Sequence, residues 1–228
     1  MIKNLVSTVG ATIVALGLMS LNSRAATLDF TTNPFVGANG NFAGTTYAIS
    51  ATGGSLYSSQ GQDGNTCVGL ACTTDGLGVN NGTGGFEDDD DEISSRGSGQ
   101  SITINFGQQI LITGLSFLDL FMDDDSDNRE VARVTYNGGV MDFLSDPNQV
   151  RFDGSSGFLM INGLNLFTDQ LIFTVFNGGL QDRGYGDYAL ASIVGVSAVP
   201  LPPALLMFGA AFSGLGFMVR RRKKALEA

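Results

Sequence analysis

The chain has 228 residues, a formal net charge of −10 at pH 7 and no histidine. Without an imidazole, neither a Ser-His-Asp nor a Cys-His nucleophile can form, and no histidine can bind a metal. The acidic charge repels phosphate backbones, so DNA and RNA are excluded as partners.

The N-terminus has the pattern of a secretory signal peptide, residues 1–25. Lys3 precedes an apolar stretch from Leu5 to Leu21, and small residues follow. This arrangement predicts cleavage between Ala25 and Ala26 and export of the remaining chain. A retained N-terminal anchor is the alternative.

Residues 26–198 are expected to form one all-β domain, because about 170 residues suffice to bury a single core. Short apolar segments alternate with Gly, Asn and Asp turns, no window has a helical period, and Asn137-Gly138 is a strong hairpin signal. The pattern predicts an antiparallel β-sandwich that is jelly-roll-like. The expected strands are 45–51, 101–106, 110–122, 130–136, 140–144, 158–166, 170–176 and 188–197.

Residues 53–99 differ from the rest of the domain, since Gly, Ser, Asn and Asp dominate and apolar residues are sparse. This composition predicts a long surface excursion. The segment holds both cysteines of the chain, Cys67 and Cys72. In an exported chain this close spacing favours a local disulfide that pins a Gly-rich turn. A two-cysteine metal site is the weaker alternative, because zinc needs two further ligands.

Two acidic runs, 87–92 and 123–128, suggest hard oxygen ligands. The second run follows an apolar strand, and its alternate aspartates could converge on one Ca²⁺ ion. It is not an EF-hand, because Gly and Glu are missing from the required positions. A solvated loop that binds nothing is the alternative for both runs, and more so for the first. The predicted calcium ligands are Asp123, Asp125, Asp127 and Asp187, the last just before the final strand.

Residues 199–228 have three parts, which are a proline-rich segment, an apolar run at 204–219 and a basic cluster. The prolines prevent a helix before the apolar run, which would form about 24 Å of membrane helix. The basic cluster predicts a cytoplasmic C-terminus, with the preceding domain outside. The proline segment is Val199, Pro200, Leu201, Pro202 and Pro203, and the basic stop is Arg220, Arg221, Arg222, Lys223 and Lys224.

This tail resembles the PEP-CTERM family of bacterial sorting signals, and most closely its Val-Pro-Leu-Pro-Ala variant, although Pro203 is inserted before Ala204. The resemblance implies a substrate of an exosortase, a membrane-embedded cysteine transpeptidase that cuts near the proline motif. The chain would span the inner membrane once before processing, and its domain would then pass to the cell surface or extracellular matrix. The setting that the family implies is exopolysaccharide or biofilm. A plain tail anchor is the alternative.

The composition of the exported part favours a passive protein. Removing the two ends, which carry +2 and +4, from the whole-chain charge leaves −16 for residues 26–198. No spacing among these carboxylates singles out a catalytic acid and base. We therefore expect a non-enzymatic surface protein. A calcium-dependent carbohydrate-binding module is the alternative, although the chain has no Trp to stack on a sugar. A carboxylate-based hydrolase is the third candidate.

Overall fold

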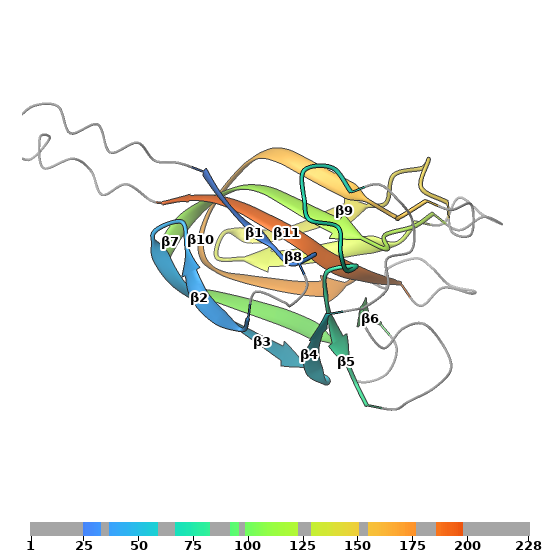
Figure 1. Ribbon diagram of the computed structural model, residues 1–228, viewed down its shortest axis with the longest axis horizontal. Helices are drawn as coiled ribbons and strands as arrows, with labels where there is room; N and C mark the ends of the chain where they lie inside the picture. The colour runs from blue at the N-terminus through green and yellow to red at the C-terminus, as the bar shows by residue number, and fades with distance from the viewer. Residues whose placement is uncertain are drawn as a thin grey trace, which may run out of the picture. The chain divides into compact units, whose positions relative to one another are not determined.

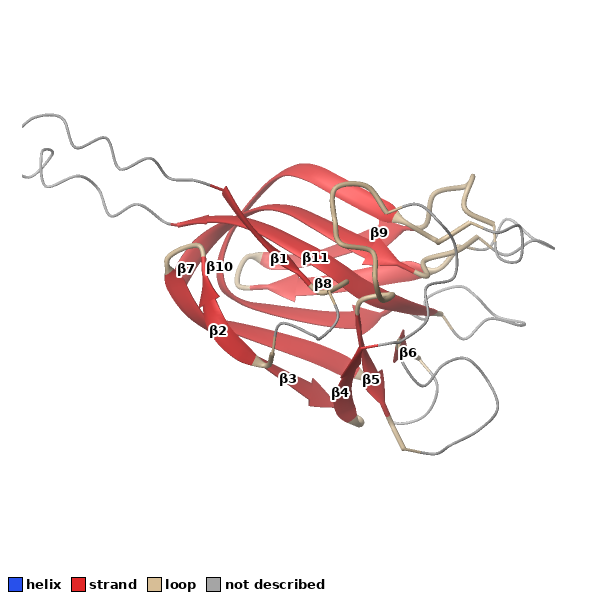
Figure 2. Cartoon of the chain, viewed as in Figure 1, coloured by secondary structure: helices blue, strands red, loops and turns tan. Residues whose placement is uncertain are grey.

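The computed structural model describes residues 25–32, 37–58, 67–82, 92–95, 99–122, 129–150, 155–176 and 186–197. These residues form eleven β-strands, paired antiparallel, and contain no helix, so the predicted all-β fold is confirmed for this part (Figures 1 and 2). The strands are β1 Ala25–Asp29, β2 Asn39–Phe42, β3 Thr45–Thr52, β4 Ser55–Ser58, β5 Leu77–Asn80, β6 Ile93–Ser94, β7 Ser101–Leu118, β8 Val131–Tyr136, β9 Gly139–Leu144, β10 Leu159–Val175 and β11 Asp187–Ser197.

Two long strands, β7 and β10, organise the fold. They pair with each other along most of their length, and each contributes to both layers of a sandwich (Figure 1). The first half of β7 also pairs with β3 and its second half with β11, whereas the second half of β10 also pairs with β8. The sequence predicted two separate strands in each case. The exposed polar residues 107–109 of β7 mark a bend and not a break, because the ladder continues on either side.

The resulting sandwich has two layers around one core. The first layer contains β2, β3, β8, β9 and the adjoining halves of β7 and β10. The second contains β11 with β1, β5 and the other halves of β7 and β10. Phe117 of the second layer lies fully buried between them. Its ring centroid is 5.7 Å from that of Phe143 and 6.5 Å from that of Phe173, both in the first layer.

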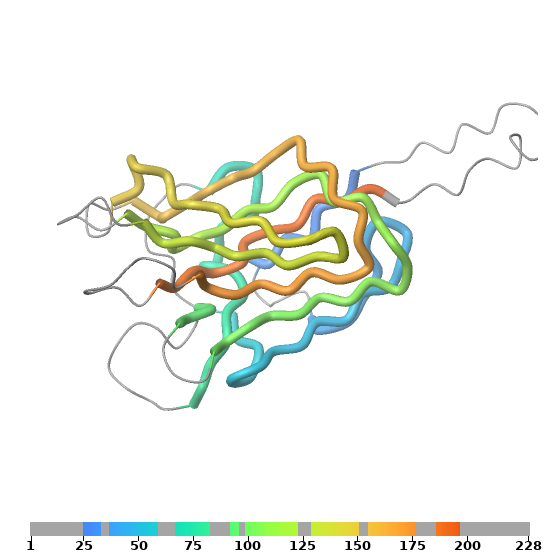
Figure 3. The backbone as a smooth tube through the Cα atoms, turned by 180° about the vertical axis from the view of Figure 1, so that it is seen from behind, coloured from blue at the N-terminus to red at the C-terminus, as the bar shows by residue number. Residues whose placement is uncertain are grey.

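The two ends of the sandwich differ. Ala25 pairs with Val196, so the start of β1 and the end of β11 lie side by side (Figure 3). The β7 bend lies near them, because Ser197 pairs with Ile110. We call this the terminal end. The opposite end, here the loop end, is where β7 finishes at Leu118 and where β11 begins at Asp187.

The expectation for residues 53–99 is wrong in part. Three strands, β4, β5 and β6, lie within this range. Leu77, Val79 and Ile93 are fully buried and belong to the main core. Strands of two to four residues separated by Gly and Asn are too short to produce a detectable period, which is why the sequence pattern missed them. The short strands β1 and β2 were missed for the same reason.

Several predictions from the two ends of the chain lie outside the described residues. These are residues 1–24 of the signal peptide, the proline segment, the apolar run 204–219 and the basic stop. Within the ranges described between 25 and 197, no helix is long and apolar enough to cross a membrane. The predicted cleavage position, between Ala25 and Ala26, falls in β1.

Candidate functional site

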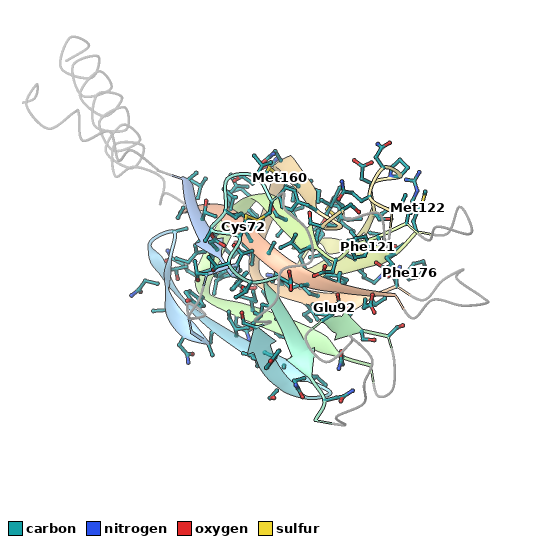
Figure 4. The ribbon with its side chains drawn as sticks, turned by 45° about the vertical axis from the view of Figure 1, so that its right-hand side comes forward. Cys72, Glu92, Phe121, Met122, Met160 and Phe176 are labelled. Atoms are coloured by element: carbon teal, nitrogen blue, oxygen red, sulfur yellow. A yellow bond between two sulfur atoms is a disulfide. The ribbon has the colours of Figure 1, made fainter. Side chains whose placement is uncertain are left out.

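The acidic segments of the sequence are attached to the loop end. Met122 and Arg129 flank the run 123–128, Glu92 ends the run 87–92, and Asp187 begins β11. Figure 4 labels Met122 and Glu92. The register brings these positions to one end, because Asp187 pairs with Ser94 and Ala189 with Leu118. Segments that are far apart in sequence are therefore anchored on neighbouring strands.

Three carboxylates at this end are buried. The side chains of Glu92, Asp119 and Asp187 are all shielded from solvent, and only 1% of Asp187 is exposed. None of the three lacks an interaction partner, as the cost of burying a lone charge requires. The sequence favoured a solvated loop for the run 87–92. Its last residue, Glu92, is instead buried in the folded framework. Its main-chain oxygen accepts a 3.1 Å hydrogen bond from Val79.

A rigid frame surrounds the run 123–128. Met122 forms β-bridges to both Arg129 and Val150, so the two residues that flank the run are held together. Next to this bridge, the Glu130 carboxylate accepts a 2.6 Å hydrogen bond from the Phe121 amide, and the Glu130 amide donates at 3.0 Å to the Phe121 oxygen. The residues that precede and follow the acidic run are therefore held together.

Gly157 completes this frame. Its φ is +57°, and a Cβ there would lie 2.5 Å from the Leu120 nitrogen, so a side chain is excluded. The close approach allows the Leu120 amide to donate to the Gly157 oxygen at 3.1 Å. Asp119, at φ +56°, donates from its own amide to Ser156. This turn joins the end of β7 at Leu118 to the segment that leads to Met122.

The described residues do not by themselves form a metal site. Between residues 25 and 197, the described ranges contain no group of three His, Cys, Asp or Glu side chains placed to hold an ion. Of the four predicted calcium ligands only Asp187 is described, and Asp123, Asp125 and Asp127 lie outside the described residues. Asp187 alone does not make a site.

Cys67 and Cys72 are joined in a disulfide, which removes the alternative of a two-cysteine metal site. The enclosed loop does more than pin a turn. Cys67 and Leu70 pack on the outer face of the second layer, against a small buried cluster of Leu118, Ala189 and Ala191. The loop therefore extends the apolar packing beyond the main core.

The same loop is held to the segment after β1. The Asp29 carboxylate accepts hydrogen bonds from the Thr31 amide at 2.9 Å, the Thr31 hydroxyl at 2.6 Å and the Ala71 amide at 2.8 Å. The Cys72 amide donates to the Thr31 hydroxyl at 2.9 Å. This network ties the start of the domain to the disulfide loop. Nothing in the sequence pattern around Asp29 indicated it.

The outer face of the first layer is polar and nearly uncharged. Gln170 donates from its amide to Asn105 at 2.7 Å across the β7–β10 pair. Arg133 binds both carboxylate oxygens of Asp142 at 2.7 Å, and its guanidinium lies 3.8 Å from the Phe176 ring centroid. The other outward residues of β3, β7, β8 and β10 include Thr46, Ser50, Thr52, Ser101, Thr103, Thr135 and Thr174.

A shallow depression opens on this face, where β2, β3 and β7 meet. Ala48 and Gly107 are small, and the amide side chains of Asn39 and Asn105 lie among the lining residues. The lining contains no charged group. The depression can therefore offer hydrogen bonds to a neutral, hydroxyl-rich ligand, but it offers neither an acid-base pair nor metal ligands. The complete lining is Asn39, Gly40, Thr46, Tyr47, Ala48, Asn105, Phe106 and Gly107.

The described tyrosines are mostly structural. Tyr47 and Tyr188 are buried, and Tyr188 donates from its hydroxyl to the Thr174 oxygen at 3.0 Å. Burial raises the pKa of Tyr188 well above its ordinary value. Tyr57 of β4 is partly exposed. Tyr185 lies outside the described residues.

No family model matches the chain, and no curated protein matches it. Among solved structures it is similar to CpGH89CBM32-5 from Clostridium perfringens, which was determined in complex with GalNAc-beta-1,3-galactose. The two are 14% identical, the match covers 66% of this chain and 95% of that chain, and the TM-score is 0.25. We base no conclusion about a ligand on so distant a likeness.

Proposed function

We propose that this chain is an exported, non-enzymatic surface protein, a jelly-roll-like sandwich with a cleaved signal peptide. In this proposal an exosortase-type transpeptidase sorts it through the C-terminal tail, and the processed domain associates with exopolysaccharide or biofilm. The observation that supports the proposal best is the pairing of Ala25 with Val196.

This pairing suits a domain that is held at a membrane by either end. The first strand begins at the predicted cleavage position, and only Ala198 separates β11 from the proline segment. From Val196 to Val199 the chain can span at most about 10 Å. A tether through either end would therefore attach to the terminal end of the sandwich.

Mass spectrometry of the mature protein tests this proposal. In the native host we expect a C-terminus within the proline segment, and an intact tail ending at Ala228 when the sorting enzyme is deleted. Pro202→Ala is expected to impair this processing while leaving the N-terminus at Ala26. Ala198→Ser, which changes the neighbouring residue outside the motif, is the matched control. An intact tail with and without the enzyme would leave only a plain membrane anchor.

The uncharged depression favours a second candidate function, which is binding of a carbohydrate. Neutral glycans are recognised by a few placed amides and hydroxyls in a shallow site, and Asn105 and Thr46 are the groups offered here. Because no carboxylate lines the depression, binding there should persist in EDTA. Calcium-dependent binding would instead point to the loop end.

Titration of the purified chain with host exopolysaccharide, with and without EDTA, separates these possibilities. Binding that is lost in Asn105→Ala but kept in Thr52→Ala would place the glycan in the depression. No binding in either buffer would remove the carbohydrate-binding candidate. The third candidate function, a carboxylate-based hydrolase, would need a measured hydrolytic activity that is lost when a specific pair of carboxylates is substituted.

We also propose that calcium stabilises the loop end. Asp123, Asp125, Asp127 and Asp187 remain the proposed ligands, and the frame of Met122 and Arg129 supports the idea because it fixes the ends of the run. An ion that binds only the native state raises its stability by mass action. The role would therefore be structural before it is functional.

A further inference from the structure

The strand β9 forms an open edge of the first layer. It is the last strand in the sheet order and pairs only with β8 among the described strands. All six of its residues, from Gly139 to Leu144, are in register with β8 without a bulge. Such an edge presents unpaired backbone donors and acceptors to any extended chain that approaches it.

The register identifies the backbone groups at this edge. The hairpin closes through a two-residue turn with Tyr136 opposite Gly139, which makes that pair a hydrogen-bonded one. Hydrogen-bonded pairs alternate along an antiparallel ladder, so the next are Val134 with Met141 and Ala132 with Phe143. The N–H and C=O groups of Val140, Asp142 and Leu144 therefore point away from β8.

The side chains at this edge are apolar and exposed. Val140 is 53% exposed and Leu144 is 51% exposed, although both lie in regular strand structure. Asp142 stands between them, and its charge is matched by the two hydrogen bonds from Arg133. The edge is thus locally neutral in a chain whose net charge is −10. Two such edges therefore bring no unpaired charge of their own together, and salt screens the charges that lie farther than about 8 Å away.

The other described edges are shorter than β9 or are interrupted. The strand β1 has five residues, β2 and β4 have four each and β6 has two. The first half of β10, which carries the exposed Met160 (Figure 4), is interrupted between Asn162 and Leu166, where Gly163 has a φ of +76°. Shortness and bulges are the usual means by which proteins prevent edge pairing, as are Lys and Pro on the edge. The β9 sequence contains none of these features.

We propose that two copies of this chain associate through their β9 strands, antiparallel, about a two-fold axis at Asp142. This register pairs Val140 of each copy with Leu144 of the other and places the two Asp142 residues opposite each other. The order of apolar, acidic and apolar residues reads the same in both directions, so apolar residues meet apolar ones. The opposed Asp142 carboxylates would repel each other if they were bare, but each is paired with Arg133 of its own copy. Self-complementarity is what a two-fold interface requires.

One strand pair buries less than the roughly 1,200 Å² of a standard interface. The dimer is therefore weak in dilute solution and is favoured where copies are concentrated. A surface on which the chain is displayed would supply that concentration. This last step depends on the proposed surface location, whereas the pairing itself does not.

Cysteine cross-linking of the full-length, exported chain tests the pairing. The two native cysteines are joined to each other, so a single introduced thiol reports on contact between copies. Opposed residues in a hydrogen-bonded pair have Cα atoms about 5.5 Å apart, within the range of a disulfide. We expect Asp142→Cys to give at least about fivefold more dimer on a non-reducing gel than Ser50→Cys, an exposed position on β3 of the same layer. Equal or absent dimer in both variants would overturn the proposal.

A second pair of variants leaves the Arg133–Asp142 contact intact. Val140→Cys and Leu144→Cys chains, expressed together, are expected to cross-link to each other more than either does to itself. Adding Val140→Lys to Asp142→Cys should lower the dimer yield about tenfold, and an unchanged yield would refute the edge geometry. C-terminal processing should be normal in all these variants, so a failure here is distinct from a failure of the sorting proposal.

Discussion

Replacing Phe117 with alanine should cost more stability than any other single aromatic truncation in the described core. Phe117 is fully buried on β7. Besides Phe143 and Phe173 of the opposite layer, its ring meets Tyr188 edge-on at 5.4 Å. The Phe117 side chain therefore contacts both layers, and its neighbours in the two layers cannot collapse together into the space that it would leave.

Truncation of a buried Phe to Ala costs about 3–5 kcal/mol, and the aromatic contacts place this site in the upper half of that range. We expect a loss of about 4 kcal/mol in the free energy of unfolding. For a domain of about 170 residues this corresponds to a fall in Tm of roughly 8–16 °C. Stabilities of native domains are about 5–15 kcal/mol, so the variant should still fold.

Thermal unfolding of the purified chain, followed by near-ultraviolet circular dichroism, measures this loss. Phe167→Ala is the matched control, because the same side chain is removed from a position that is 54% exposed. We expect the control to change stability by less than about 1 kcal/mol. Phe117→Leu, which keeps most of the volume, should lie between the two. Equal effects of Phe117→Ala and Phe167→Ala would refute the assignment of Phe117 to the core.

Three further predictions concern the disulfide, a carboxylate and calcium. Replacing both Cys67 and Cys72 with serine should lower stability by about 2 kcal/mol, the entropic value for so small a loop; urea unfolding that shows no change would mean that packing alone holds the loop. The hydrogen bonds from Arg133 hold the pKa of Asp142 below its ordinary value. The ionised Asp142 therefore contributes its full stabilisation at pH values above the ordinary pKa, and this stabilisation is lost as the pH falls through the lowered pKa. In an NMR titration, Arg133→Leu should return the Asp142 midpoint to the ordinary range, and an unmoved midpoint would contradict this cause. Calcium should raise the melting temperature of the purified chain relative to EDTA, and identical midpoints would remove the proposed ion.

The positions of the longer strands were predictable, although β7 and β10 were each expected as two strands, and so was the hairpin that carries a turn signal. Asn137-Gly138 joins β8 and β9 as expected, and Val131, Arg133 and Thr135 alternate with buried residues. The short strands β1, β2, β4, β5 and β6 were not predicted. Their residues are held by pairing with β3, with β11 and, for β4, with β5, and not by any local preference that a sequence window can reveal.

Among the candidate sites too, local features could be predicted from the sequence and features that depend on strand order could not. The cysteine spacing predicted the disulfide, because loop closure between near neighbours is a local matter. The burial of Glu92 and Asp187 could not be predicted, since it depends on which strands lie beside β11. The open edge at β9 is likewise a property of strand order, because the same six residues would be unremarkable in the middle of a sheet.

By itself the sequence was enough to identify the all-β class and to exclude histidine chemistry. It also predicts an exported chain with a sorting tail. These follow from composition, from turn chemistry and from the local order of apolar, proline and basic residues. Tertiary structure alone decided that Ala25 lies beside Val196, that the residues next to the acidic runs lie at the opposite end and that β9 pairs on one side only among the described strands. Each of these facts depends on pairing between segments far apart in the chain, which no local pattern encodes.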